Sequence, residues 1–347
     1  MKILIVSERF FPSVGGVQTV TRLLAEALVG LAHRVTVVTR EPGPDEDVRG
    51  VRLLRRPWAI RLFSQYRRAD AIIVQGLPMR LGWPLLRRPD GWAIHHIQPV
   101  ACEGRLSGCL RAKLAARVRH AAVSRALARE LPWFAQAVLP NPYEDEVFRN
   151  DESVARNRDV IFVGRLITEK GVSVLMRALA ILQRGGRSVT ATIVGDGPER
   201  RGLEEMVKST KLEQSVVFAG QITGSVLAQL LNHHRLMVVP SVYHEPFGVV
   251  ALEGIACGCV VIGSDAGGLP EAIGPCGTTF PLGDAPSLAG KIQHTLASPE
   301  KMNSLRAGAR SHLAVHRPSV VARKYLELFC TPGSAGVSPA SFLLMKP

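Results

Sequence analysis

The sequence has 347 residues and a formal net charge of +14, with 46% hydrophobic and 21% charged residues. This composition excludes a disordered chain, and the length exceeds what one ordinary core sustains, so we expect two globular domains. No apolar run is long enough to span a bilayer, and the first residues resemble a buried strand rather than a secretion signal. We therefore expect a cytoplasmic protein.

Positive charge is concentrated in the first half of the chain. Residues 52–129 contain 16 basic residues against three acidic ones. A surface of this kind attracts an anionic partner, such as acidic lipid headgroups at the inner face of a membrane, a phosphorylated acceptor or a nucleic acid. The alternative interpretation is a solvated, arginine-rich surface without a specific partner. Both interpretations stay open at this point.

The cysteines do not follow a metal-binding or disulfide pattern. They stand at positions 102, 109, 257, 259, 276 and 330, and this spacing matches neither a paired zinc ribbon nor a secreted disulfide framework. We expect reduced thiols and no metal site.

The first part of the chain alternates strands and helices. Apolar spacing predicts a helix at 17–28 and strands at 3–6, 35–38, 71–74, 92–94, 121–123 and 137–139. The first strand, helix and second strand form a βαβ unit, which requires parallel pairing through a right-handed crossover. We therefore expect a doubly wound α/β sheet, similar to a Rossmann fold.

A polar stretch at 150–158 separates a second region with the same alternation. Strands are predicted at 160–163, 190–194, 216–218, 236–239 and 260–262, and helices at 172–183, 200–208, 225–232, 247–256, 286–297, 299–312 and 319–329. We expect one domain at 1–149 and a second Rossmann-like domain at 150–312. The segment 313–330 should return as a helix to the first domain, and 331–347 should be a disordered tail.

Two loops of the first domain follow strand ends, where open α/β sheets bind ligands. Gly15 and Gly16 precede a helix and would let an anion approach the backbone, although they do not form the dinucleotide fingerprint. His95 and His96 follow the strand at 92–94. Either imidazole could contact a substrate or act as a base, or could simply be packed in the core.

Two loops of the second domain carry stronger signals. Arg165 and Lys170 surround a turn after the strand at 160–163 and could converge on one anion, unless the lysine pairs with Glu169. The loop after 236–239 places Glu245 before a helix with Pro246 in its first turn. Glu253 follows in an apolar helix, where a carboxylate needs a polar partner such as a ribose diol.

Together these segments resemble the retaining glycosyltransferases of family 4, which have the GT-B fold. The resemblance is carried by EPFGVVALE at 245–253, FVGRLITEKG at 162–171, ATIVGDGP, GGLPE at 267–271 and GGV at 15–17, and it extends over residues 1–330. It implies two Rossmann-like domains that face a central cleft, with acceptor binding in the first and donor binding in the second. The turn Asn141-Pro142-Tyr143 departs from the Asn-Gly-Val-Asp that is common in the family.

The resemblance also implies roles for individual residues. Arg165 and Lys170 would grip the donor diphosphate and replace a metal ion, Glu253 would bind the ribose hydroxyls, and Glu245 would contact the transferred sugar. The remaining expected contacts are the backbone N–H groups of Phe247, Gly248 and Val249, Gly16 beside the diphosphate, and His95 beside the anomeric carbon, with His96 as the alternative histidine.

The implied reaction moves a hexose-type sugar from a nucleotide-diphosphate sugar, UDP- or GDP-linked, to a glycan, lipid-linked or small-molecule hydroxyl. Cell-envelope or exopolysaccharide synthesis is the expected setting, with no cofactor and no nucleic-acid partner. Two alternatives remain: a nucleotide-sugar epimerase on the same fold, or a basic membrane- or nucleic-acid-binding protein on a degenerate scaffold.

Overall fold

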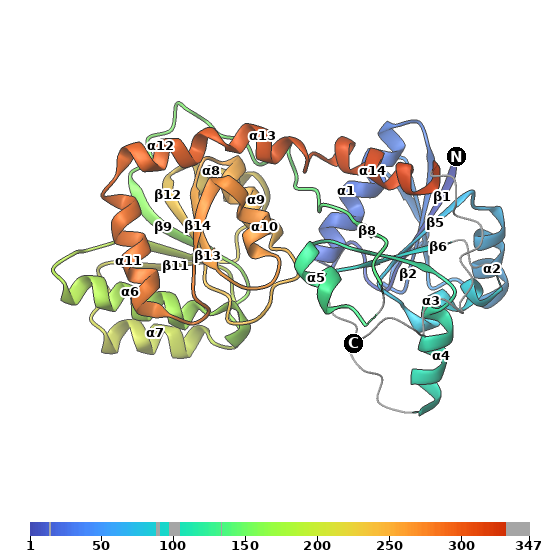
Figure 1. Cartoon of the computed structure of the whole chain (residues 1–347), viewed down its shortest axis with the longest axis horizontal. Helices are drawn as coiled ribbons and strands as arrows, with labels where there is room; N and C mark the ends of the chain where they lie inside the picture. Colours follow the sequence, from blue (N-terminus) through green and yellow to red (C-terminus); the bar gives the residue numbers. More distant parts are fainter. Residues whose placement is uncertain (14, 88–90, 97–104, 133, 331–347) are drawn as a thin grey trace. The chain divides into compact units, whose positions relative to one another are not determined.

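The computed structural model describes residues 1–13, 15–87, 91–96, 105–132 and 134–330, and it divides the chain into two compact units. The first unit comprises Met1–Pro142 and the chain from Pro318 onward, and the second is Tyr143–Arg317 (Figure 1). The expected boundary at 149/150 therefore falls inside the second unit. Tyr143 and Phe148 are buried, and the Tyr143 N–H donates to the carbonyl of His316 at 3.3 Å. The tail expected at 331–347 lies outside the described residues.

The first unit is built on an eight-stranded sheet in the order β3-β4-β2-β1-β5-β6-β7-β8. Its strands are β1 (Lys2–Ser7), β2 (Arg34–Thr39), β3 (Glu46–Val48), β4 (Val51–Arg55), β5 (Ala71–Gln75), β6 (Gly91–His95), β7 (Arg119–Ala122) and β8 (Ala137–Val138). All pairs are parallel except β3 with β4. The hairpin of β3 and β4 was not predicted, because its polar edge strand lacks an apolar run.

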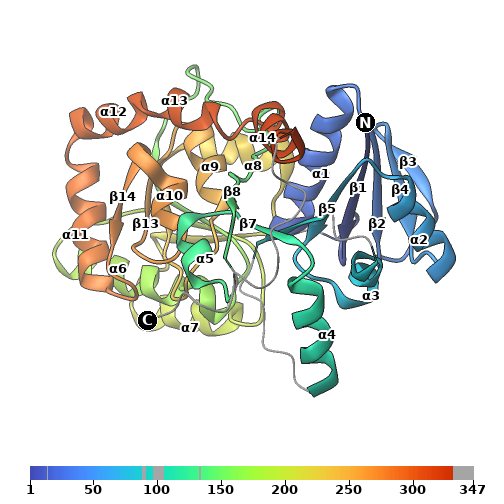
Figure 2. The same cartoon turned by 45° about the vertical axis from the view of Figure 1, so that its right-hand side comes forward.

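Helices cover this sheet. They are α1 (Gly16–Gly30), α2 (Ala59–Arg68), α3 (Met79–Gly82), α4 (Arg105–Ala115), α5 (Arg125–Glu130) and α14 (Pro318–Cys330), with a 3-10 turn at Trp83–Leu86. Helix α14 lies beside α1 in both views (Figure 1 and Figure 2) and packs against it. The carboxy-terminal helix thus belongs to the first unit, although the segment expected as one piece from 313 begins as a helix only at Pro318.

The second unit has a six-stranded, all-parallel sheet in the order β11-β10-β9-β12-β13-β14. Its strands are β9 (Arg158–Val163), β10 (Ala191–Val194), β11 (Val216–Gly220), β12 (His234–Val239), β13 (Val260–Ser264) and β14 (Gly277–Phe280). The core combines strand residues such as Val160 and Leu236 with helix residues such as Leu175 and Leu288. Buried branched side chains on both faces are typical of a parallel sheet that is covered by helices.

The helices of the second unit are α6 (Val172–Arg184), α7 (Arg200–Ser209), α8 (Gly224–Asn232), α9 (Val249–Ala256), α10 (Leu269–Ile273), α11 (Ala285–Leu296), α12 (Pro299–Ala307) and α13 (Ala309–Ala314). One predicted helix, 299–312, is wrong as a single element, because the chain breaks it at Gly308 into α12 and α13. The α/β class and the two Rossmann-like sheets are as predicted.

Each sheet has one point at which its strand order reverses. In the second unit, β9 is bordered by β10 on one side and by β12 on the other, so the chain leaves β9 in one direction and later returns to its opposite edge. Ligands of open α/β sheets bind beyond the carboxyl ends of the strands at such a point. The loops after β9 and β12 are therefore the first place to look for a site.

Four of the cysteines have side chains that the structure describes. Cys109, Cys257, Cys259 and Cys276 are free thiols, whereas Cys102 lies outside the described residues. Burial raises the pKa of Cys259 to about 12 and that of Cys276 to about 11.

In the part of the chain that the structure covers, no helix combines the length and apolar character of a membrane span.

Candidate functional site

Backbone hydrogen bonds join three loops at the carboxyl edge of the second sheet. The N–H of Val242, after β12, donates to the carbonyl of Glu169, after β9, at 2.9 Å. The N–H of Gly268, after β13, donates to the carbonyl of Glu245 at 2.6 Å. The loops that carry the expected donor-binding residues are thereby fixed to one another.

Glycines allow these loops to come so close. Gly171 has the left-handed φ of 65°, and a Cβ atom there would collide with the carbonyl oxygen of Pro240. Gly267 has a φ of 60°, and its Cβ would collide with the carbonyl oxygen of Glu245. Gly171 and Gly267 therefore serve backbone packing between loops.

We expect Gly171→Ala to destabilise the protein much more than Gly186→Ala. Gly186 has a similar φ of 75° but open space around its Cβ position, so its substitution costs only the left-handed backbone, about 1–2 kcal/mol. At Gly171 the collision with a backbone carbonyl adds to that cost. Chemical denaturation of both variants measures the difference, and equal losses of stability would show that the two loops do not need this close approach.

A partly buried ion pair lies between the loops after β9 and β12. Lys170 Nζ is 2.6 Å from Glu245 Oε1, and the side chain of Glu245 is only 7% exposed. The hydroxyl of Ser241 donates to the same oxygen at 2.6 Å, and Lys170 Nζ is 3.5 Å from the hydroxyl of Tyr243. Lys170 therefore pairs with Glu245. It does not pair with Glu169, the partner that the sequence analysis considered as the alternative to an anion site.

The electrostatics of this pair keep the lysine charged. Burial alone would lower the pKa of Lys170, but the charges of Glu245 and Tyr243 and their hydrogen bonds outweigh it, so the pKa is raised. Burial and the charge of Glu245 raise the pKa of the Tyr243 phenol. Ser241 and Tyr243 were not singled out from the sequence, although both belong to the loop that contains Glu245.

Arg165 lies at the same edge with its side chain exposed. Within the described residues, its guanidinium takes part in no ion pair or side-chain hydrogen bond. The loop that holds it is anchored instead through its backbone: the N–H of Leu166 donates to the carbonyl of Asp196 at 2.9 Å, and the N–H of Glu199 donates to the carbonyl of Leu166 at 3.0 Å. The guanidinium is thus available to an anion at the sheet edge.

Helix α9 begins later than predicted. Gly248 has a left-handed φ of 99° and precedes the first helical residue, Val249, so the prediction that Pro246 stands in the first turn is wrong. The ring of Phe247 is buried and packs against the ring of His316, with centroids 5.4 Å apart. Because the first N–H groups of a helix have no partner in the helix, Val249 still presents such a group at this loop.

Glu253 stands in the middle of α9 and is partly buried. Burial, with a smaller contribution from the charge of Glu144, raises the pKa of Glu253 to about 8. Its carboxyl group makes no hydrogen bond or ion pair to any residue that the structure describes. A carboxyl group in such a position is costly unless a polar partner meets it, so it is a candidate for binding hydroxyl groups.

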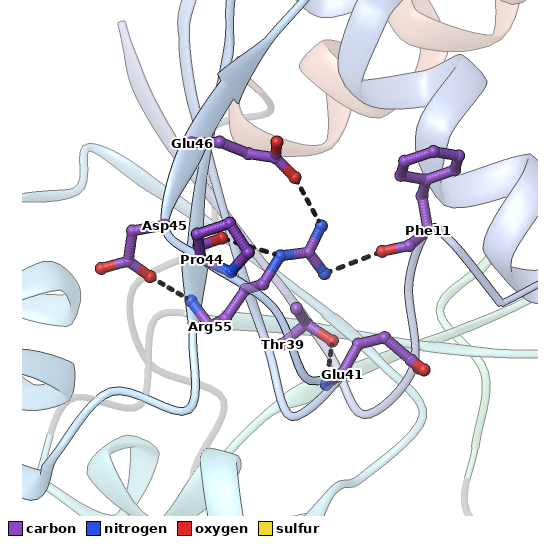
Figure 3. A network of polar contacts seen from close by, with 7 residues as sticks. All are labelled: Phe11, Thr39, Glu41, Pro44, Asp45, Glu46 and Arg55. Carbon is purple, nitrogen blue, oxygen red and sulfur yellow. Dashed lines mark hydrogen bonds and ion pairs between the residues drawn. The ribbon is translucent and has the colours of Figure 1, made fainter.

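In the first unit, a buried arginine holds the loop between β1 and Gly16. The guanidinium of Arg55 is 2% exposed and donates to the carbonyl oxygens of Phe11 at 2.8 Å and Pro44 at 3.0 Å (Figure 3). It also pairs with Glu46 at 2.8 Å. Gly16 is exposed, and a Cβ atom there would meet nothing within 4 Å, so its surroundings in the first unit impose no demand for glycine.

His95 and His96 both lie at the end of β6, and both are buried. His95 Nε2 is 2.9 Å from Nδ1 of His120, whose Nε2 is 3.0 Å from the carbonyl of Ala115. Because a carbonyl can only accept, His120 donates through Nε2, and His95 then donates its own Nε2–H to His120. His96 Nε2 is 2.6 Å from Gln75 Oε1.

Both histidines are neutral at physiological pH. Burial, followed by the charges of His120, His96 and Arg111, lowers the pKa of His95 to about 3. Burial lowers the pKa of His96 to about 4. A base with so low a pKa removes a proton poorly at neutral pH, so a neutral hydrogen-bonding role suits either ring better. Among the described residues, no three His, Cys, Asp or Glu side chains gather as a metal-binding group.

Comparison with known proteins finds a matching family model and several similar proteins. Residues 144–312 match the family model of glycosyl transferases group 1. Glycogen synthase of Mycobacterium tuberculosis is 28% identical over 376 aligned positions, which cover 90% of both chains. Sucrose-phosphate synthase of Thermosynechococcus elongatus has a similar structure, with a TM-score of 0.77, 24% identity and coverage of 96% of this chain and 100% of that one.

HepE of Anabaena in complex with UDP and glucose is also similar, with a TM-score of 0.75, 20% identity and coverage of 95% of this chain and 99% of that one. The two units, one with an all-parallel and one with a mostly parallel sheet, therefore have the GT-B fold. The second unit, Tyr143–Arg317, contains the whole of the region that matches the glycosyl transferases group 1.

Proposed function

We propose that the protein transfers a hexose-type sugar, with retention of configuration, from a nucleotide-diphosphate sugar to a hydroxyl acceptor. The observation that carries this proposal is the pair of Lys170 and Glu245 at the point where the second sheet reverses its strand order. A cation, a hydrogen-bonding carboxylate and a helix start meet there, and these groups suit a diphosphate attached to a sugar.

The second unit would bind the donor. Lys170 and Arg165 would neutralise the diphosphate as the nucleotide leaves, which supplies the stabilisation that a metal ion gives in other transferases. Glu245 would accept hydrogen bonds from the sugar hydroxyls, and the N–H groups of Phe247, Gly248 and Val249 would contact sugar and phosphate. Glu253 would accept hydrogen bonds from the ribose diol.

The first unit would provide the acceptor side. Gly16 would border the diphosphate, and His95 would donate or accept a hydrogen bond near the anomeric carbon in its neutral form. The leaving phosphate oxygen would take the acceptor proton on the attacked face, so no side chain needs to form a covalent intermediate. The low pKa of His95 supports this division of roles.

As donor we propose a UDP- or GDP-linked hexose, and as acceptor a hydroxyl of a glycan, a lipid-linked compound or a small molecule. One similar protein is a glycogen synthase, and another was solved with UDP and glucose. We propose cell-envelope or exopolysaccharide synthesis as the setting, in the cytoplasm and without a cofactor.

Incubation of the protein with candidate nucleotide sugars, with and without glycan acceptors, tests the reaction. Proton NMR should show a product whose anomeric configuration equals that of the donor, and only slow hydrolysis when the acceptor is omitted. An epimerised nucleotide sugar in the absence of acceptor would favour the epimerase alternative and contradict the proposal. Inverted configuration in the product would contradict retention.

We also propose that the basic first unit contacts an anionic membrane surface. Trp58 and Ile60, at the start of α2, are 78% and 83% exposed, and Arg56 and Arg61 stand beside them in the sequence. An exposed aromatic ring beside arginines suits the boundary between lipid headgroups and acyl chains.

Trp58→Ala should weaken binding to phosphatidylserine vesicles about 10- to 100-fold, because burial of a large apolar side chain contributes about 1.5–3 kcal/mol. Vesicle sedimentation measures this effect. The control Val226→Ser alters a 59% exposed residue of the second unit and should bind as the wild type does. If the wild-type protein does not bind anionic vesicles at low salt, the membrane contact is wrong.

A further inference from the structure

The second unit contains a cavity whose lining includes none of the residues assigned to the donor site. Its volume is about 620 Å³, within the size range of small-molecule sites. The charged lining consists of Arg149, Arg306, Arg310 and Arg317 against Asp145 and Glu152. Arginine therefore dominates, and these side chains come from segments more than 150 positions apart in the chain.

Arg306 in this lining has no acidic partner among the described residues. Its Nε–H donates to the carbonyl of Gly258 at 2.9 Å, and its Nη2 is buried without a hydrogen-bond partner. Burial lowers the pKa of Arg306, and the nearby positive charge of Arg156 lowers it further. The wall thus holds a guanidinium whose charge is not neutralised.

The neighbouring Arg156 adds to this excess of charge. It donates to the carbonyl oxygens of Cys257 at 2.7 Å and Asn232 at 2.9 Å, and to the side-chain oxygen of Asn150. All of these acceptors are neutral. Two adjacent guanidinium groups are therefore stabilised by hydrogen bonds alone, an arrangement that an anion would improve.

The acids of the lining are outnumbered, because Asp145 and Glu152 face four arginines. Burial raises the pKa of Asp145, although the charge of Arg317 acts in the opposite direction. Glu152, which also lines the cavity, is exposed. The rest of the lining includes the apolar side chains of Ile255, Ala256 and Leu313, which could contact the carbon atoms of a ligand.

The cavity also borders both connections between the units. The chain enters the second unit at Tyr143 and leaves it at Arg317, and both residues line the cavity. The N–H of Tyr143 donates to the carbonyl of His316, so the two connecting segments are already in contact. A ligand here would touch both segments at once.

We propose that this cavity binds the phosphate group of a small phosphate ester, through Arg306 and the surrounding arginines, at a site separate from the donor site. Arginine forms charge-assisted and often bidentate bonds to phosphate, which suits a cluster of these side chains. The inference does not rest on the proposed reaction, because the lining shares no residue with the donor site.

Isothermal titration of inorganic phosphate and of glycerol 3-phosphate tests the proposal. The background is the double variant Lys170→Met, Glu245→Gln, which disables the donor site without leaving a buried charge unpaired. Binding should persist in that background and weaken at least tenfold when Arg149→Gln and Arg310→Gln are added. The control Arg201→Gln alters an arginine of the same unit that is 92% exposed, and it should leave binding unchanged. Arg149 and Arg310 are exposed, so the fold should survive their substitution.

Phosphate binding that is lost in the folded double-variant background, or that is unchanged by both cavity substitutions, would overturn the proposal. Tighter binding of glycerol 3-phosphate than of phosphate would support a site for an ester, and equal binding would restrict the site to free phosphate and contradict the ester. Titration of nucleoside diphosphates into the wild type and the cavity variant tests the donor site separately. The cavity substitutions should leave nucleotide binding unchanged, so failure of the phosphate site can be told apart from failure of the donor site.

Discussion

Replacement of Lys170 by methionine is expected to lower kcat/KM about a thousandfold, or about 4 kcal/mol of transition-state stabilisation. The partly buried lysine lies 2.6 Å from Glu245 and stays charged, so it would meet the charge that develops on the leaving diphosphate. Initial rates with a nucleotide sugar and an identified acceptor measure the loss. The control Lys208→Met removes an exposed lysine of the same unit and should retain full activity.

The same substitution also leaves the buried carboxylate of Glu245 without its cation, so lost stability could imitate lost catalysis. The double variant Lys170→Met, Glu245→Gln removes both charges and should recover much of the stability but none of the activity. Restoration of activity in the double variant would show that Lys170 acts only as a structural partner of Glu245.

Glu253→Gln is expected to stabilise the protein without ligand at pH 8 and to weaken donor binding about 10- to 100-fold, because a hydrogen bond to a charged group contributes about 1.5–3 kcal/mol. The pKa of Glu253 is raised from 4.5 to about 8. Between these values the folded protein retains a proton that the unfolded chain has released, so stability decreases as pH rises. Glutamine, which cannot ionise, removes that decrease.

Glu253→Gln should thus raise the stability of the free protein and lower its affinity for the donor. These opposite signs distinguish a binding role of Glu253 from a purely structural one. Ribose hydroxyls donate hydrogen bonds best to the ionised carboxylate, so donor affinity of the wild type should increase as pH rises towards 8, and that of Glu253→Gln should not. Thermal melting and nucleotide titration at several pH values measure both. Unchanged donor affinity in the variant would exclude Glu253 from the site.

Much of the fold follows from local patterns. The strands at 3–6, 160–163 and 236–239 are short apolar runs that are buried from both faces, and each lies where the structure has β1, β9 and β12. The hairpin of β3 and β4 was missed because Glu46–Val48 is a polar edge strand. The start of α9 was misplaced because Gly248 has a left-handed φ of 99°. A Cβ atom there would collide with the side chain of Leu269, and this close approach between residues far apart in the chain cannot be predicted from a local pattern.

The candidate site could be predicted only in part, because its chemistry depends on long-range contacts. The sequence indicated Lys170 and Glu245 separately, but 75 positions separate them and only the folded loops bring them into an ion pair. The same holds for His95, whose hydrogen bond to His120 depends on the pairing of β6 with β7. No local sequence motif indicated Arg306 or the cavity that it lines, because the lining residues come from distant segments.

Isothermal titration of the wild-type protein with UDP, GDP and ADP tests the central claim most directly. If the loops after β9 and β12 hold the diphosphate of the donor, at least one nucleotide binds the wild type, and both Lys170→Met and Glu253→Gln weaken that binding. Nucleotide binding that is equally tight in both variants would contradict the account, because the diphosphate and the ribose would then be held elsewhere.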